Sequence, residues 1–213
     1  MSRIPLPVLS RLSLAFDMIT RLEEKGERKI SSAELGRYLG QTGHTIRKDI
    51  HFLGNAGSAG AKYEIADLKK LIAVNLGFQH PKRCCIVGLG RLGSAILEYT
   101  STSGQDAISV VAGFDSSVNR IETIQTNVEL FPAYQLVEVA RQKRIELAII
   151  TVPPENAQEV AERCCEGGVT GLLNFTDVII KPPNENVFVR SVDITGEMRI
   201  LAAQAFTSLT ATE

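Results

Sequence analysis

Residues 84–93 have the sequence Cys84-Cys85-Ile86-Val87-Gly88-Leu89-Gly90-Arg91-Leu92-Gly93. The four apolar residues predict a short buried strand, and a helix is predicted over 94–99. The glycines between them have the spacing G-x-G-x-x-G, which in a strand–turn–helix context indicates a dinucleotide-binding turn. Gly88 permits the tight turn, Gly90 lets the backbone approach a pyrophosphate, and Gly93 permits close packing of helix on strand. The candidate cofactor-binding residues of this segment are Gly88, Leu89, Gly90, Arg91, Leu92 and Gly93.

A second predicted strand, residues 108–114, ends at Asp115. This carboxylate lies 22 residues after Gly93, near the position where an acidic side chain holds the adenosine ribose hydroxyls. An acid there favours NAD over NADP, because it would repel a 2′-phosphate. The alternative is that Asp115 is only a turn residue at the end of its strand.

Strands and helices continue to alternate, with strands predicted over 147–153 and 169–174 and a helix over 155–165 between them. Such alternation is typical of a parallel, doubly wound sheet. We therefore expect an α/β Rossmann domain over residues 81–213, with its ligand at the carboxyl ends of the strands. The further candidates there, each alternatively a strand stop or turn residue, are Val152, Pro153 and Asn174.

The first eighty residues have a different pattern. Apolar residues at helical spacing predict helices over 7–25, 33–39 and 44–53, and Ser31-x-x-Glu34 matches a capping box. A tight turn containing Gly43 separates the second and third helices, which is typical of a helix-turn-helix.

Residues after the third helix predict the rest of a winged helix. The glycine-rich stretch 54–65 predicts a small hairpin, the wing, and Asp67 is expected to cap a last helix over 68–76. We therefore expect a winged-helix DNA-binding domain over residues 1–80. The alternative is a small helical domain that docks another protein.

The third helix has the polarity of a recognition helix. Ile46, Ile50 and Leu53 share one side at i, i+4, i+7 and are expected to be buried, which leaves hydroxyl, imidazole and cationic groups outward. Such groups meet base edges and phosphates in a major groove. The candidate DNA-binding residues of the domain are Ser32, Thr42, His44, Thr45, Arg47, Lys48, His51 and Lys62.

Charge is divided along the chain in the same way. Residues 1–80 carry 12 basic and 8 acidic side chains, whereas residues 81–213 carry 11 and 16, within a net charge of −1. A basic module attached to an acidic one indicates nucleic acid at one end only. With no signal peptide and no run of about 20 apolar residues, we expect a cytoplasmic protein with no membrane partner.

The residues for metal binding and catalysis are missing from the sequence. The cysteines form the adjacent pairs Cys84-Cys85 and Cys164-Cys165, without the two-residue gap of a thiolate metal site, so we expect reduced packing residues and no metal. Residues 81–213 contain no histidine and no Tyr-x-x-x-Lys pair to move a proton beside a hydride. We therefore expect binding without turnover and assign no catalytic residue. The alternative is a small NAD-dependent oxidoreductase.

Over nearly its whole length the chain resembles the Rex family of redox-sensing repressors. The segments that carry the resemblance are Ile4-Pro5, Ser10-Arg11-Leu12, Ser31-Ser32-x-x-Leu35, Ile46-Arg47-Lys48-Asp49-Ile50, Ile86 to Ala95, Phe114-Asp115, Thr151-Val152-Pro153 with Ala157-Gln158, Gly171 to Phe175, and Val192-Asp193. Their common order and spacing are far more specific than one glycine motif.

The resemblance implies a homodimer whose C-terminal helix, residues 196–207, crosses into the partner subunit. It implies a transcriptional repressor that binds AT-rich inverted-repeat operators. NADH releases this repressor from the DNA and NAD⁺ permits it to bind, so that it reports the ratio of NADH to NAD⁺. Tyr99 matches a family tyrosine near the nicotinamide, and Asp193 matches an aspartate of the switch.

Two departures from the family pattern bear on this function. The wing carries Gly57-Ser58-Ala59-Gly60 where family members have a basic pair, so Lys62 is its remaining cation. Ala15 and Asp17 replace a Tyr and an Arg of the first helix, and the family Arg can pair with the aspartate matching Asp193. Two carboxylates cannot form that pair, so a diverged regulator with a lost or rewired NADH response is a further alternative.

Overall fold

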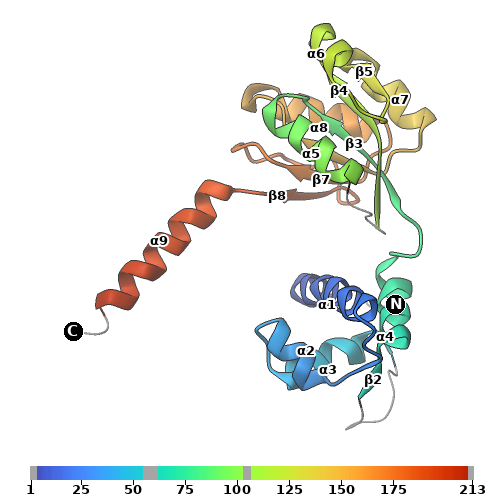
Figure 1. Ribbon diagram of the computed structural model, residues 1–213. Helices are drawn as coiled ribbons and strands as arrows, with labels where there is room; N and C mark the ends of the chain where they lie inside the picture. The colour runs from blue at the N-terminus through green and yellow to red at the C-terminus, as the bar shows by residue number, and fades with distance from the viewer. Residues whose placement is uncertain (1–3, 55–61, 103–106, 211–213) are drawn as a thin grey trace. The chain divides into compact units, whose positions relative to one another are not determined.

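The computed structural model describes residues 4–54, 62–102 and 107–210. The chain divides into two compact units, Met1–His80 and Pro81–Glu213 (Figure 1). Each unit has its own apolar core, so each is described by itself.

The first unit is helical with a small two-stranded sheet. Its elements are α1 (Leu6–Glu24), β1 (Lys29–Ile30), α2 (Ser32–Tyr38), α3 (Gly43–Phe52), β2 (Tyr63–Glu64) and α4 (Ile65–Leu76). One face of each helix supplies the core, as the fully buried side chains of Ile19, Leu35 and Ile72 illustrate. The predicted capping box of α2 is present: Ser31 Oγ accepts from Glu34 N–H, and the Glu34 carboxylate accepts from Ser31 N–H.

One strand of the expected wing, β2, has a pairing that the sequence did not predict. β2 pairs antiparallel with β1, with Lys29 opposite Glu64 and Ile30 opposite Tyr63, whereas we expected its partner within residues 54–65. Residues 55–61 lie outside the described residues. The next helix begins at Ile65, so Asp67 lies in its first turn and does not cap it.

The second unit contains, within the described residues, a six-stranded parallel sheet of order β5-β4-β3-β6-β7-β8. Its strands are β3 (Lys82–Val87), β4 (Ile108–Asp115), β5 (Leu130–Pro132), β6 (Leu147–Ile150), β7 (Gly171–Asn174) and β8 (Phe188–Ser191). The order reverses between β3 and β6, which is the topological switch point of a doubly wound sheet. The predicted Rossmann architecture is confirmed.

Helices cover both faces of this sheet, and strand periodicity decides which residues each face receives. The helices are α5 (Arg91–Thr102), α6 (Val118–Thr123), α7 (Leu136–Gln142) and α8 (Ala157–Glu166). Cys85 and Val87 point to the core beneath α7 and α8, whereas Ile86, between them, packs with Leu97 of α5. All three strand residues are buried because both faces are covered.

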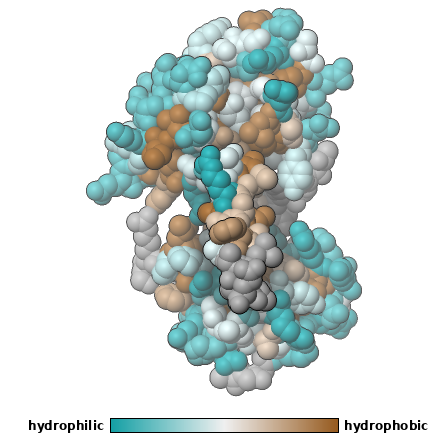
Figure 2. All heavy atoms as spheres, turned by 90° about the vertical axis from the view of Figure 1, so that its left-hand side faces the viewer, coloured by the Kyte–Doolittle hydropathy of each residue, from teal (hydrophilic) through white to brown (hydrophobic). Residues whose placement is uncertain are grey.

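The helix expected over residues 196–207 spans Ile194–Thr210 and is labelled α9. Its apolar side chains are largely exposed, among them Ile194, Met198 and Leu201 at 60%, 66% and 64%. Figure 2 shows apolar side chains (brown) at the surface of the face that includes α9. Within the described residues, no helix is long and apolar enough to cross a bilayer.

Candidate functional site: a dinucleotide cavity and a recognition helix

The glycine-rich turn has the geometry that its spacing predicts. Gly88 has φ +96°, and a Cβ there would lie 2.8 Å from the backbone of Thr151 at the end of β6. A Cβ on Gly93 would lie 1.9 Å from the carbonyl oxygen of Gly88. A Cβ on Gly90 would meet no atom within 4 Å, because Gly90 borders open space. Gly88 and Gly93 are therefore required by the fold, and Gly90 leaves room for a ligand.

Thr151, which was not among the predicted site residues, holds this turn in place. Its hydroxyl donates to the Gly88 carbonyl oxygen at 2.6 Å and lies 3.1 Å from that of Val87. Ser94, in the first turn of α5, donates to the Leu89 carbonyl oxygen at 2.9 Å. These bonds fix the turn between the ends of β3 and β6.

A cavity of about 550 Å³ opens beside the turn, at the carboxyl ends of β3, β4 and β6. Ligands of open α/β sheets bind at this edge. The predicted residues that line it are Gly88, Gly90, Asp115, Val152 and Pro153. The charged and polar residues that also line it are Ser116, Arg120, Thr151, Asn156, Glu159 and Arg163.

Asp115 is buried, with 3% of its surface exposed, and its carboxylate is already engaged. Oδ2 accepts a hydrogen bond from Leu89 N–H and Oδ1 accepts one from Ser117 N–H, each at 2.7 Å. Arg120 Nη1 lies 3.3 Å from both oxygens. Asp115 therefore ties the glycine-rich turn to the end of β4, besides facing the cavity.

The other predicted cofactor residues take different positions. Asn174 is fully buried and does not line the described cavity. Its Nδ2 donates to the Val178 carbonyl at 2.8 Å, and its Oδ1 accepts from Thr176 N–H at 2.9 Å, so it shapes the loop after β7. Leu89 is a core residue, whereas Arg91 and Leu92 are exposed at the start of α5.

The two predicted switch residues lie on α5 and at the start of α9. Tyr99 of α5 is 64% exposed. Asp193 precedes α9 and accepts a hydrogen bond from Gly196 N–H at 2.8 Å, so its carboxylate caps that helix.

In the first unit, α3 presents the predicted polar face. Ile46 and Ile50 are buried in the core, and Thr42 caps the helix by accepting from Thr45 N–H at 3.1 Å. The predicted outward side chain of Thr45 is partly exposed. The other predicted outward side chains are exposed, and they are Thr42, His44, Arg47, Lys48 and His51. Two of these exposed residues, Arg47 and Lys48, are cations at consecutive positions of the helix.

Ser32 differs from the expectation, because only 6% of its surface is exposed. Its hydroxyl lies 3.3 Å from Arg47 Nη2, which donates to it. Ser32 is therefore buried and holds the Arg47 side chain through this hydrogen bond, and it does not lie on the exposed surface.

A partly buried ion pair joins α1 to α3, and the sequence reasoning missed it. Arg11 Nε and Nη2 donate to the two carboxylate oxygens of Asp49 at 2.6 and 2.8 Å. The Asp49 side chain is 4% exposed and that of Arg11 is 25% exposed. The hydrogen bond to Asp49 raises the pKa of Arg11. This bidentate contact fixes the rotation of α3 about its axis.

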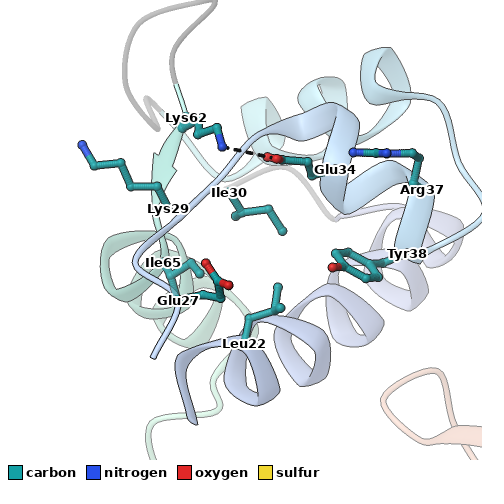
Figure 3. A pocket seen from close by; sticks show the side chains of 9 residues that line it. All are labelled: Leu22, Glu27, Lys29, Ile30, Glu34, Arg37, Tyr38, Lys62 and Ile65. Carbon is teal, nitrogen blue, oxygen red and sulfur yellow. Dashed lines mark hydrogen bonds and ion pairs between the residues drawn. The ribbon is translucent and has the colours of Figure 1, made fainter. Parts of the chain in front are cut away.

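Lys62, at the base of the wing, faces Glu34 of α2. Its Nζ lies 3.2 Å from Glu34 Oε1, at the rim of a hollow of about 460 Å³ (Figure 3). The bonds from Ser31, with a smaller contribution from Lys62, lower the pKa of Glu34 to about 2. The positive charge of Lys62 is thus balanced within the unit.

The cysteines belong to the core of the second unit. Cys84, Cys85 and Cys164 are buried and Cys165 is partly exposed. Burial raises the pKa of Cys84 to about 12, and the hydrogen bond with Cys164, together with burial, holds the pKa of Cys85 well above its usual range. Across the described residues, no group of three or more His, Cys, Asp or Glu side chains is placed to hold a metal ion.

Comparison with known proteins places both units in one family. The family model described as a CoA binding domain matches residues 79–178, and one described as a putative DNA-binding protein N-terminus matches residues 3–50. The redox-sensing transcriptional repressor Rex 1 of Enterococcus faecalis is 33% identical over 93% of this chain and 91% of its own. Rex of Carboxydothermus hydrogenoformans is 34% identical over 93% and 95%. This chain belongs to the Rex family of redox-sensing transcriptional repressors.

Solved structures of the Rex family have the same fold. The structure of RSP, a Rex-family repressor, superposes with a TM-score of 0.83 at 24% identity, covering 100% of this chain and 99% of its own. RSP in complex with NAD⁺ and operator DNA superposes with a TM-score of 0.84 at 25% identity, covering 99% of both chains. The Rex fold therefore extends over both units, each with the elements described above.

Proposed function

We propose that this protein is an NADH-responsive transcriptional repressor, with α3 as its DNA-recognition helix and the cavity at the glycine-rich turn as its NAD(H) site. The observation that carries the proposal is that one chain joins a helix with the exposed cations Arg47 and Lys48 to a cavity at a glycine-rich Rossmann turn. A regulator that meets both the chromosome and the NADH pool acts in the cytoplasm, and we assign it no catalytic residue.

The residues of the cavity fit a dinucleotide. The open space at Gly90 is where backbone can approach a pyrophosphate, and α5 begins at the next residue, so its N-terminal end favours the negative charge. Asp115 lies where the adenosine ribose is held, with Val152 and Pro153 on the adjoining wall. Tyr99 is assigned to the nicotinamide end through the family resemblance.

DNA recognition is assigned to the outward face of α3. Arg47 and Lys48 supply guanine or phosphate contacts, and the hydroxyl and imidazole groups reach base edges. Those groups belong to Thr42, Thr45, His44 and His51. Lys62 adds a phosphate contact only if its ion pair with Glu34 breaks.

Dimerisation is assigned to α9, because a helix with so much exposed apolar surface needs a partner. A two-fold dimer matches an inverted-repeat operator, one recognition helix to each half-site. NADH then acts by binding the DNA-incompetent arrangement of the dimer more tightly than the competent one. Substitution of Leu201 by Glu is expected to give monomers in sedimentation and to weaken operator binding.

The test is selection of bound duplexes from a random pool, in parallel with NAD⁺ and with NADH. An inverted repeat enriched with NAD⁺ and lost with NADH is the expected result. Arg47→Ala and Lys48→Ala should each weaken binding and lower the slope of log affinity against log salt by about one. Their affinity for NADH should stay unchanged. Absence of enrichment in either arm contradicts the DNA-binding assignment.

A second candidate is a regulator that binds DNA without nucleotide control. It is favoured by α1, where Ala15 is buried in the core and Asp17 is exposed. Neither residue type carries a positive charge that could pair with Asp193. Equal operator affinity with and without saturating NADH, in a protein that binds NADH, would select this candidate.

A further inference from the structure

The side chain of Arg47, on the exposed face of α3, is held by a contact with α2. Its Nη2 donates to Ser32 Oγ at 3.3 Å, and it makes no other hydrogen bond with the described residues. One N–H of Nη2 is used in this way. The second N–H of Nη2 and those of Nη1 are left, and such a pair of nitrogens forms the fork that binds O6 and N7 of guanine. The bond therefore restrains the guanidinium without using up the donors that read a base.

Ser32 is a fixed acceptor because the start of α2 is fixed. The preceding residue, Ser31, caps α2 and exchanges two hydrogen bonds with Glu34. The start of α3 packs directly on this turn, since a Cβ on Gly43 would lie 3.0 Å from the Cα atom of Ala33. The position of Ser32 relative to α3 is therefore set by the close packing of two helix backbones.

The neighbouring cation, Lys48, has no such support. It is exposed, and no hydrogen bond or ion pair joins it to another of the described residues. A lysine ammonium is a point charge on a flexible stem, which suits a phosphate, whereas a planar guanidinium suits a bidentate contact. An unrestrained arginine loses side-chain entropy when it binds. A bond that already holds Arg47 reduces that loss for one orientation of its guanidinium.

We propose that Ser32 is a positioning residue for base recognition, whose hydroxyl holds Arg47 so that its guanidinium reads a guanine, while Lys48 contacts phosphate. The inference rests on the proposed function, because it takes α3 as the DNA-recognition helix. It assigns different roles to two adjacent cations. It also gives part of the sequence discrimination to a buried side chain, of which only 6% of the surface is exposed.

The experiment measures binding of the full-length protein to the selected operator and to duplexes in which each base pair of a half-site is replaced in turn. Arg47→Ala should remove the preference for guanine at one position, by about tenfold. Ser32→Ala should lower the preference at that same position by about threefold and leave the other positions unchanged. The salt dependence of its affinity should not change, because no charge is removed. In the Arg47→Ala background, Ser32→Ala should have no further effect on base preference.

Two control variants separate positioning from folding and from charge. Ser31→Ala removes the adjacent hydroxyl, which caps α2, so it should lower the free energy of unfolding and leave base preference unchanged. Lys48→Ala should weaken binding to every duplex alike and lower the slope of log affinity against log salt by about one. Urea unfolding checks that Ser32→Ala is folded, as expected for alanine within a helix.

The outcomes separate this inference from the function beneath it. Unchanged base preference in folded Ser32→Ala overturns the inference and leaves DNA binding by α3 intact. An equal loss of preference in Ser31→Ala also overturns it, because the effect would then come from the start of α2 and not from the hydroxyl bond. Unchanged operator affinity in Arg47→Ala overturns the proposed recognition helix as well.

Discussion

Replacing Arg11 by Met removes the cation that compensates Asp49 and keeps most of the aliphatic stem. The Asp49 carboxylate is 4% exposed, and the pair is bidentate at 2.6 and 2.8 Å. Removal of one partner of a buried pair costs about 3–5 kcal/mol, because the other charge is left without compensation. Arg11 is 25% exposed, so water reaches that side of the pair, and we expect the lower end, about 3 kcal/mol.

The assay is urea unfolding of the full-length protein followed by circular dichroism, with operator affinity measured well below the transition. The control is Lys29→Met, which breaks an exposed pair with Glu64 and should lower the free energy of unfolding much less, because water already screens that pair. The double variant Arg11→Met with Asp49→Leu should recover much of the loss, because no buried charge remains. A loss for Arg11→Met no larger than that for Lys29→Met would refute the reasoning.

Three other predictions address the turn, the capping box and the cysteines. Gly90→Val should fold normally and lose NADH affinity, whereas Gly93→Ala should lower the free energy of unfolding because its Cβ meets a carbonyl oxygen; calorimetry and urea unfolding distinguish them. Glu34 has a folded pKa of about 2 against 4.5 ordinarily, so its stabilisation is present above pH 4.5 and is lost as pH falls toward 2. Unfolding of Glu34→Gln should lack that pH-dependent component, and an unchanged pH profile would contradict the assignment. Alkylation of the native protein at pH 8, read by mass spectrometry, should label Cys165 before the buried Cys84, whose pKa is raised to about 12; equal labelling rates would count against the packing role.

The sequence predicted the features of the fold that depend on residues close together in the chain. The glycine turn, the capping box at Ser31 and the buried face of α3 depend on residues within a few positions of one another, so spacing alone predicts them. The pairing of β1 with β2 joins segments more than thirty residues apart and leaves no periodic signal in two-residue strands. The pairing of β2 with β1 was therefore not predicted, and the partner strand that we expected within residues 54–65 falls mostly on residues 55–61, outside the described residues.

Side-chain contacts were predicted less well than elements. Arg11 and Asp49 are 38 positions apart, and only the packed helices bring them together. Asp115 was placed correctly at the end of its strand, but its contacts with Leu89 and Arg120 depend on the folded turn. Asn174 ends its strand as expected, and the direction of its amide, into the loop, has no counterpart in the pattern of residue types.

The bonds around the glycine-rich turn bear on how fast a ligand is captured. Thr151 and Asp115 hold the turn from two strand ends, through bonds within the protein of 2.6 and 2.7 Å. The entropy of ordering that segment is therefore lost during folding, and little of it remains to be lost on association. A dinucleotide should then bind in a single kinetic phase whose rate rises linearly with its concentration, and changes in affinity should appear mainly in its dissociation rate.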